Sequence, residues 1–318
     1  MQPFWSPQAM ANHAETPSYY IPHSGWYPVW LAASACLMVV GLASFLNANS
    51  AGEEGSLLGF YLGFAGLAVV LYQWFAKVVN ENTVGLVSGQ LKKSYIWGMG
   101  WFIFSEVMFF AAFFGALFYA RQLSVQWLGG EGGKGITGDY LWPEFTPEWP
   151  VMQNPDNGVF TPPAHSMAPP GSATSEVSGW LGYLPLWNTI ILLTSSVTVH
   201  FAHTGLKNDS RSQFIGWLAL TVILGCIFLV LQVEEYIEAY NHLGLTLSSG
   251  IYGSTFFILT GFHGFHVTLG TFMLLVQLIR AIRGHFSHHD CFGFEASSWY
   301  WHFVDVVWVG LFIFVYLL

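Results

Sequence analysis

Long apolar stretches alternate with short polar connections along most of this 318-residue chain. Seven of them reach the ~20 residues that a helix needs to cross a bilayer. We expect the spans at Trp26–Leu46, Ser56–Ala76, Tyr95–Ala120, Gly179–Phe201, Gln213–Tyr236, Ile251–Ile279 and Ser297–Leu318. A lone strand leaves its backbone polar groups unpaired in hydrocarbon, so each span is predicted to be a helix. The pattern therefore predicts an all-α, polytopic membrane protein with seven transmembrane helices.

The composition agrees with a chain whose solvent is mostly lipid. Charged residues make up 8%, hydrophobic residues 53% and aromatic residues 18%, whereas a soluble domain carries roughly a quarter charged residues. The formal charge of −9 provides no basic field for phosphates, which argues against nucleic acid as a partner. Cys36, Cys226 and Cys291 are scattered without a CxxC pair, so we expect neither a disulfide framework nor a thiolate metal site.

The basic residues predict an orientation, because Lys and Arg gather in the cytoplasmic connections of membrane proteins. One set of alternate connections holds most of the nine basic residues: Lys77, Lys92, Lys93, Lys207, Arg211, Arg280 and Arg283. The other set holds Arg121 and Lys134. We therefore expect the N-terminus on the cytoplasmic side and the C-terminus outside.

One long connection divides the chain. Residues 121–178 are rich in Gly, Pro and Trp, and loops of this length are usually functional, covered by a partner or disordered. The tryptophans predict that the loop packs onto something. We expect an N-terminal segment with the first two spans in residues 1–90, and the other five spans with the long outer loop in residues 91–318.

Glu106 lies in the middle of the third predicted span, between phenylalanines and without a basic residue nearby in the sequence. An ionisable residue at membrane depth is a functional candidate, and desolvation favours its neutral form. Glu106 is therefore either a proton-handling or reactive carboxyl, or a neutral acid that is hydrogen-bonded inside the bundle through Ser105 or another helix. We favour the second interpretation on the sequence alone.

Three further carboxylates, Glu234, Glu235 and Glu238, end the fifth predicted span. Glu234 and Glu238 share one helical face. Because this end lies at the predicted outer surface, we expect a hydrated helix end.

Histidines recur at helical spacing and raise the question of a metal site. Three spans carry a pair spaced i, i+3: His200 with His203, His263 with His266, and His302 with Asp305. A di-iron bundle needs a Glu-x-x-His on each of two helices, and a zinc enzyme of the HExxH type needs that motif; the chain has neither. We favour core histidines, packed where Gly261 and Gly264 let helices approach closely, and expect no metal in this chain.

The connection after the sixth span, Arg280–His289, is basic and rich in histidine. It suits the anionic headgroups of the inner leaflet, or it is a simple positive anchor for the helix end. The sequence leaves both interpretations open.

Several of these motifs resemble subunit III of cytochrome c oxidase. The resemblance lies in Phe292–Trp308, Gly253–Phe257, Gly261–His266, Ser105–Phe110 and Tyr72–Trp74, which follow one another in the order of that family. It covers the chain from about residue 26 to its end.

The resemblance implies two helices that lean away from a bundle of five, with phospholipid in the cleft between them. It also implies that the haems and the active-site copper lie in subunit I, and that the electron-entry copper pair lies in subunit II. Cytochrome c would then be reached only through subunit II. The implied role of this chain is to keep subunit I active over many turnovers and to support its proton uptake, in the inner membrane of a bacterial cell.

The resemblance also assigns roles to particular residues. Glu106 matches the family's buried, carbodiimide-reactive carboxyl, and four positions match residues that line the cleft or hold lipid headgroups: Trp74, Glu81, Arg280 and His285. Phe75 departs from the family, which often has a second tryptophan there. The long outer loop points to a bacterial branch and to an added contact with another subunit.

Three alternatives remain beside this interpretation. Subunit III of a quinol oxidase is related, but it typically lacks the first two spans. A free-standing proton-coupled transporter would use Glu106 and the histidines as a relay, and broken spans or inverted repeats would support it. A membrane metalloenzyme would be revealed by metal analysis of the isolated chain.

Overall fold

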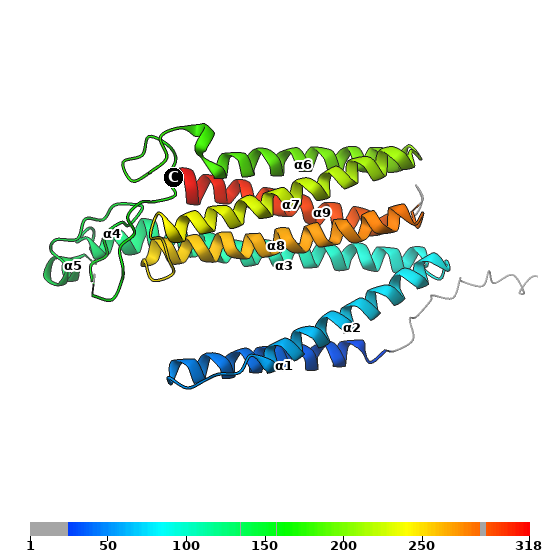
Figure 1. Ribbon diagram of the computed structural model, residues 1–318, viewed down its shortest axis with the longest axis horizontal. Helices are drawn as coiled ribbons and strands as arrows, with labels where there is room; N and C mark the ends of the chain where they lie inside the picture. Colours follow the sequence, from blue (N-terminus) through cyan, green and yellow to red (C-terminus); the bar gives the residue numbers. More distant parts are fainter. Residues whose placement is uncertain (1–24, 134, 157, 287–290) are drawn as a thin grey trace, which may run out of the picture. The chain divides into compact units, whose positions relative to one another are not determined.

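The computed structural model describes residues 25–133, 135–156, 158–286 and 291–318. In this part of the chain, seven helices are long and apolar enough to cross a membrane, which confirms the predicted all-α membrane fold. Their main helical segments are α1 (Tyr27–Ser50), α2 (Leu58–Thr83), α3 (Gly89–Tyr119), α6 (Leu184–Lys207), α7 (Arg211–Asn241), α8 (Ile251–Ile282) and α9 (Phe292–Leu311). Figure 1 shows these helices, coloured from blue to red in the order of the sequence.

Short helical segments extend or connect these spans. The turn η2 (Ala120–Ser124) and the helix α4 (Val125–Leu128) prolong α3, and η4 (Phe312–Leu317) prolongs α9. The long connection contains α5 (Ile136–Leu141) and, just before α6, the turn η3 (Trp180–Gly182).

The ends of the spans differ from the hydropathy pattern. The third helix begins at Gly89 rather than Tyr95, and includes Lys92 and Lys93, because a helix continues past the hydrocarbon into the polar interface. The fourth begins at Leu184 rather than Gly179, with Pro185 in its first turn. Proline favours that position, since the first helical N–H groups have no intrahelical partner.

The chain divides into two compact units, residues 1–97 and 98–318. We call the first the helix pair, after α1 and α2, and the second the bundle, which contains α6 to α9 and most of α3. The segment 1–24, part of the expected N-terminal domain, lies outside the described residues. The lipid-filled cleft stays a prediction.

Glycines let the backbones of α1 and α2 touch. A Cβ atom added to Gly41 would overlap the backbone nitrogen of Phe60, and one added to Gly63 would overlap that of Met38. Apolar side chains gain little from meeting each other in lipid, so close backbone contact between small residues is a common way to join membrane helices. The helix pair is thus held together by close backbone packing at small residues.

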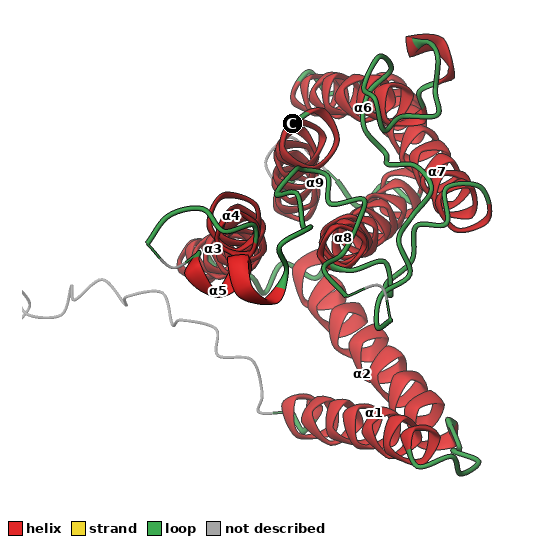
Figure 2. Ribbon diagram, turned by 90° about the vertical axis from the view of Figure 1, so that its left-hand side faces the viewer, coloured by secondary structure: helices red, strands yellow, loops and turns green. Residues whose placement is uncertain are grey.

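In the bundle, α9 packs against α6 and α8, and Figure 2 shows these helices nearly end-on. The largest fully buried side chains include Trp301 and Trp308 of α9. Trp301 fits between two glycines: a Cβ atom on Gly225 or on Gly270 would come within 2.9 Å of its ring. The core is therefore built around α9, with small residues on its neighbours making room for aromatic rings.

The long connection covers one end of the bundle, which we call the loop end. The backbone N–H of Met167 donates to the hydroxyl of Tyr252 at 3.0 Å, and Asn154 Nδ2 donates to the carbonyl of Ser249 at 3.2 Å. The Trp149 ring meets the Tyr252 ring edge-on at 5.7 Å. This confirms for Trp149 the prediction that loop tryptophans pack. Lys134 lies outside the described residues.

Candidate functional site

Glu106 on α3 is paired with a histidine from another helix. Its Oε2 lies 2.9 Å from Nε2 of His266 on α8, and its Oε1 lies 3.4 Å from Oγ of Ser105. The side chains are 23% exposed for Glu106 and 7% exposed for His266. The structure thus supplies the partner from another helix that the local sequence could not identify.

The geometry fixes the number of protons in this pair. Nδ1 of His266 lies 2.6 Å from the carbonyl oxygen of Phe262, and a carbonyl only accepts, so Nδ1 carries hydrogen. The contact between Nε2 and the Glu106 carboxyl then needs one more proton, held on either partner. Both arrangements, imidazolium with carboxylate or imidazole with carboxylic acid, leave the pair neutral overall, which lowers the cost of placing it at membrane depth.

Aromatic rings enclose His266. The ring of Phe110 meets it edge-on, with centroids 4.9 Å apart, and Tyr300 stacks on it at 6.4 Å. The proton shared with Glu106 is therefore shielded from water on the bundle side.

His263 is fully buried one turn away from His266 on α8. Its Nε2 lies 3.2 Å from the carbonyl of Val304, so this nitrogen donates. The ring lies 5.1 Å from the Trp308 ring. These contacts fit a histidine packed in the core of the bundle.

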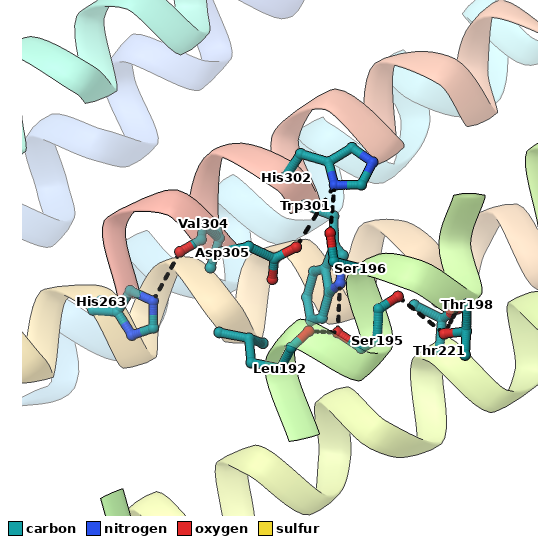
Figure 3. Close-up of polar contacts among 10 residues, drawn as sticks. All are labelled: Leu192, Ser195, Ser196, Thr198, Thr221, His263, Trp301, His302, Val304 and Asp305. Carbon is teal, nitrogen blue, oxygen red and sulfur yellow. Dashed lines mark hydrogen bonds and ion pairs between the residues drawn. The ribbon is translucent and has the colours of Figure 1, made fainter. Parts of the chain in front are cut away.

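The third i, i+3 pair of the sequence forms a group with a serine from α6, shown in Figure 3. Nδ1 of His302 lies 2.8 Å from Oγ of Ser196 and 3.7 Å from Oδ2 of Asp305. The Asp305 side chain is 5% exposed, whereas the His302 side chain is 42% exposed. Asp305 is thus buried in the bundle while His302 reaches its surface.

Sequence reasoning missed the polar contacts that connect α6 to α9. Trp301 Nε1 donates to Oγ of Ser195 at 3.0 Å (Figure 3), and Nε2 of His203 lies 3.1 Å from Oε1 of Glu295. Ser196 and His203 are seven residues apart, and so are Glu295 and His302. That common spacing is the signal that could have revealed the pairing.

At the loop end the structure corrects one expectation. Glu234 is exposed, as a hydrated helix end requires, but Glu235 is fully buried. The Glu235 carboxyl accepts hydrogen bonds from the Tyr316 hydroxyl and from Nε2 of Gln232, at 3.3 Å. Helix periodicity explains the difference, because adjacent residues point in different directions and Glu235 faces the core.

Tyr183, just before α6, lies near this carboxyl. Burial raises the pKa of its hydroxyl, with a further contribution from Glu235. The hydroxyl stays protonated and donates to the carbonyl of Met167 at 2.9 Å, which ties the long loop to the start of α6.

Of the four expected lipid-contacting residues, two lie in the helix pair. The Trp74 ring stacks on the Tyr27 ring at 6.0 Å, and Lys77 lies over the same tyrosine ring at 5.8 Å. Glu81 is buried, with its Oε1 3.9 Å from Nζ of Lys77. A cavity of about 480 Å³ beside them is lined by Gly25, Trp26, Tyr27, Trp30, Val70, Gln73 and Lys77.

The other two lie at the end of α8 that is opposite the loop end. Arg280 donates to Oε1 of Gln277 at 2.9 Å, and its guanidinium lies 4.6 Å from the centre of the Phe286 ring. His285 is half-buried. Residues 287–290, which complete the basic segment, lie outside the described residues.

A metal site finds no support in the described ranges. Within them, no group of three or more His, Cys, Asp or Glu side chains is arranged to hold a metal ion. Four histidines of the i, i+3 pairs, His203, His263, His266 and His302, instead contact protein groups.

Comparison with known proteins identifies the family. The sequence profile of the family described as cytochrome c oxidase subunit III matches residues 17–133 and 180–318. The chain belongs to the cytochrome c oxidase subunit III family. It is a multi-pass membrane subunit of an oxidase that associates with other oxidase subunits. The match skips residues 134–179, most of the long connection.

Curated relatives cover nearly the whole chain. The chain is 36% identical to cytochrome c oxidase subunit 3 of Osphranter robustus over 95% of this chain and 97% of the relative. It is 37% identical to the subunits of Scyliorhinus canicula and Drosophila melanogaster, over 96% of this chain and 98% of each relative.

Proposed function

We propose that this chain is the non-catalytic core subunit III of a proton-pumping cytochrome c oxidase. It stabilises subunit I, carries structural phospholipid and supports proton uptake, while the haems and copper belong to subunits I and II and cytochrome c docks through subunit II. The observation that carries the proposal is the family match on both the helix pair and the bundle. The match to the first two spans favours a cytochrome c oxidase over a quinol oxidase.

Co-purification tests this assignment. Gently solubilised membranes should yield the chain together with a haem-copper subunit I and a copper-bearing subunit II, with cytochrome c oxidase activity in the same fraction. Selective removal of this chain should leave the initial rate nearly unchanged and shorten the number of turnovers before inactivation. Recovery of a stable chain without haem-bearing partners would refute the proposal.

The proposed location is a bacterial inner membrane, with the N-terminus cytoplasmic and the C-terminus periplasmic. The uneven distribution of Lys and Arg supports this orientation. In a background with Cys291 replaced by Ala, Asn208→Cys should react with membrane-impermeant thiol reagents only from the cytoplasmic side. Ala164→Cys, in the long connection, should react only from outside. Both positions are exposed, and reversed labelling would overturn the orientation.

Lipid binding is proposed at two places. In the helix pair, the cavity beside Lys77 combines a cation with tryptophans, a composition that suits a headgroup at the membrane interface. In the bundle, Arg280 and His285 lie at the end of α8, where cations meet anionic headgroups. A basic residue near an anionic membrane surface contributes about 1 kcal/mol.

Replacing Arg280 by Ala tests the second place. We expect less phospholipid phosphorus per purified oxidase and a shorter working life, with little change in initial rate. Gln277→Leu is the matched control, because it removes the 2.9 Å hydrogen bond to Arg280 and keeps the charge. Equal lipid content in Arg280→Ala and the unmodified enzyme would contradict the assignment.

A further inference from the structure

The surface between α6 and α9 carries a stripe of polar side chains. On α6 the stripe contains Ser196, His200 and His203, spaced i, i+4 and i+7, so the three share one helical face. On α9 it contains Glu295 and His302, spaced i and i+7. We call these five residues the α6–α9 seam.

Two contacts fix the register of the seam. Ser196 meets His302 at 2.8 Å, and His203 meets Glu295 at 3.1 Å. Seven residues forward along α6 correspond to seven residues back along α9, as expected for antiparallel helices that pack side by side. The seam therefore runs continuously along the facing surfaces of α6 and α9.

The seam extends into the middle of the membrane. His302 lies ten residues after the first residue of α9, which corresponds to about 15 Å along a helix, close to half of a hydrocarbon core of ~30 Å. Ser196 is likewise near the middle of α6. Headgroups and bulk water do not reach this depth, so an exposed side chain here meets either lipid tails or another protein.

His302 does not suit contact with lipid tails. Its side chain is 42% exposed, its Nδ1 is used by Ser196, and among the described residues no hydrogen bond reaches its Nε2. In every protonation state Nε2 is a donor or an acceptor. An unpaired polar group in hydrocarbon costs free energy.

Buried Asp305 adds an independent observation. Neither of its carboxylate oxygens has a hydrogen-bond partner within the described part of the chain, although Oδ2 lies 3.7 Å from the His302 ring. Asp305 therefore approaches His302 from the bundle side, on its Nδ1 edge, and leaves Nε2 of His302 without a partner among the described residues. The seam is complete only when a hydrogen-bonding group from outside these helices meets Nε2 of His302.

We infer that the α6–α9 seam is a protein interface, occupied by a membrane-spanning helix of another oxidase subunit that brings a hydrogen-bonding side chain to His302 at mid-membrane depth. Only a helix can present such a group there, because its own backbone is already paired. This inference rests on the proposed function, since it places the partner within the oxidase.

Photo-crosslinking in the intact oxidase tests the seam. A photoreactive amino acid is placed at Val306, which is 72% exposed and lies one turn from His302 on α9. The matched control is Val230 on α7, which is 62% exposed. We expect the Val306 probe to give a product with another oxidase subunit in at least fivefold excess over the Val230 probe. Products only with lipid, with a second copy, or within this chain would overturn the inference.

Substitutions at His302 give a second, independent readout. His302→Leu suits lipid tails better than histidine does, so a lipid-facing seam predicts equal or better retention of this chain in the purified oxidase. An interface predicts the opposite, a several-fold lower ratio of this chain to haem after detergent washing, with partial recovery in His302→Gln. If the chain co-purifies with the other oxidase subunits but both of these tests fail, the seam is not a protein interface, and the proposed function is unaffected.

Discussion

The helix pair and the bundle are both built from apolar helices, but they are held together in different ways. In the helix pair, α1 and α2 approach through Gly41 and Gly63, where backbones touch. In the bundle, side chains from different helices interlock: Trp301 with Ser195 and Glu106 with His266. The first joint depends on small residues that leave space, and the second on large or polar residues that fill it.

This difference shows what apolar composition does and does not specify. Hydrophobicity places a helix in the membrane, yet it distinguishes poorly between one apolar neighbour and another, because lipid tails are equally apolar. Specific joints must come from close fit or from hydrogen bonds. The bundle uses both, and the following substitutions separate the two contributions.

The largest effect is expected in the bundle core. Trp301→Ala removes a fully buried ring and its hydrogen bond to Ser195, which should lower the free energy of unfolding by about 3–5 kcal/mol. Unfolding in mixed detergent measures this change, and hydrogen exchange shows which helices open. Trp217→Ala, at a position that is 37% exposed, should cost much less. Equal losses in both variants would contradict the central role of Trp301.

The next effect is expected in the helix pair. Gly63→Leu introduces atoms where the backbone of Met38 already lies, so the helices must separate, at a cost of roughly 1–3 kcal/mol. Hydrogen exchange should increase in α1 and α2 and stay unchanged in α8 and α9. Gly115→Leu on α3, where an added Cβ meets nothing within 4 Å, is the control. Increased exchange in the bundle alone would disprove the proposed glycine joint.

An effect of similar size is expected at the loop end. Glu235→Ala leaves the buried hydroxyl of Tyr316 without its acceptor, which should cost about 1–3 kcal/mol. Glu235→Gln should retain most of the stability, because its amide oxygen still accepts. The exposed neighbour gives the control, since Glu234→Ala should change stability by less than about 0.5 kcal/mol. Similar losses at both positions would mean that burial does not distinguish them.

The smallest effect is expected at Glu106. Glu106→Gln keeps a hydrogen-bonding group opposite His266, so assembly and most of the oxidase activity should persist, with a stability change below about 1 kcal/mol. Labelling of this chain by hydrophobic carbodiimides should disappear, since the carboxyl is gone. His266→Leu, which takes away the partner, should be the more disruptive change.

Activity measurements on the assembled Glu106→Gln oxidase decide the role of this carboxyl. Retained oxygen reduction agrees with a neutral pair that joins α3 to α8. Complete loss in a correctly assembled enzyme would instead place Glu106 on an obligatory proton path, and the supporting role would no longer hold.

Much of the fold could be read from the pattern of residues. Seven apolar stretches predicted seven membrane helices, because the hydrocarbon thickness sets the length of a span and excludes unpaired backbone. The ends of the helices were predicted less accurately. For example, α3 begins at Gly89 and includes Lys92 and Lys93. Hydropathy indicates where the lipid begins, whereas a helix continues as long as its backbone hydrogen bonds do.

The sequence indicated Glu106 but not its pairing with His266. The isolated charge of Glu106 marked it as important, but nothing local pointed to His266, 160 residues further along. Glu234 and Glu235 were treated alike, although one is exposed and the other is fully buried. Such differences depend on which face of a helix meets its neighbours, and that is decided by packing.

The sequence by itself determined that the chain is an all-helical membrane protein, and its motifs indicated the family. These properties follow from local features of the chain: the length of its apolar segments, the cost of leaving backbone groups unpaired in lipid, and the order of its short sequence motifs. Only the tertiary structure decided that Glu106 shares one proton with His266, that Glu235 is buried, and that Ser196 and His302 meet at the surface between α6 and α9. Those contacts join residues far apart in the chain, and their energies exist only once the helices have packed.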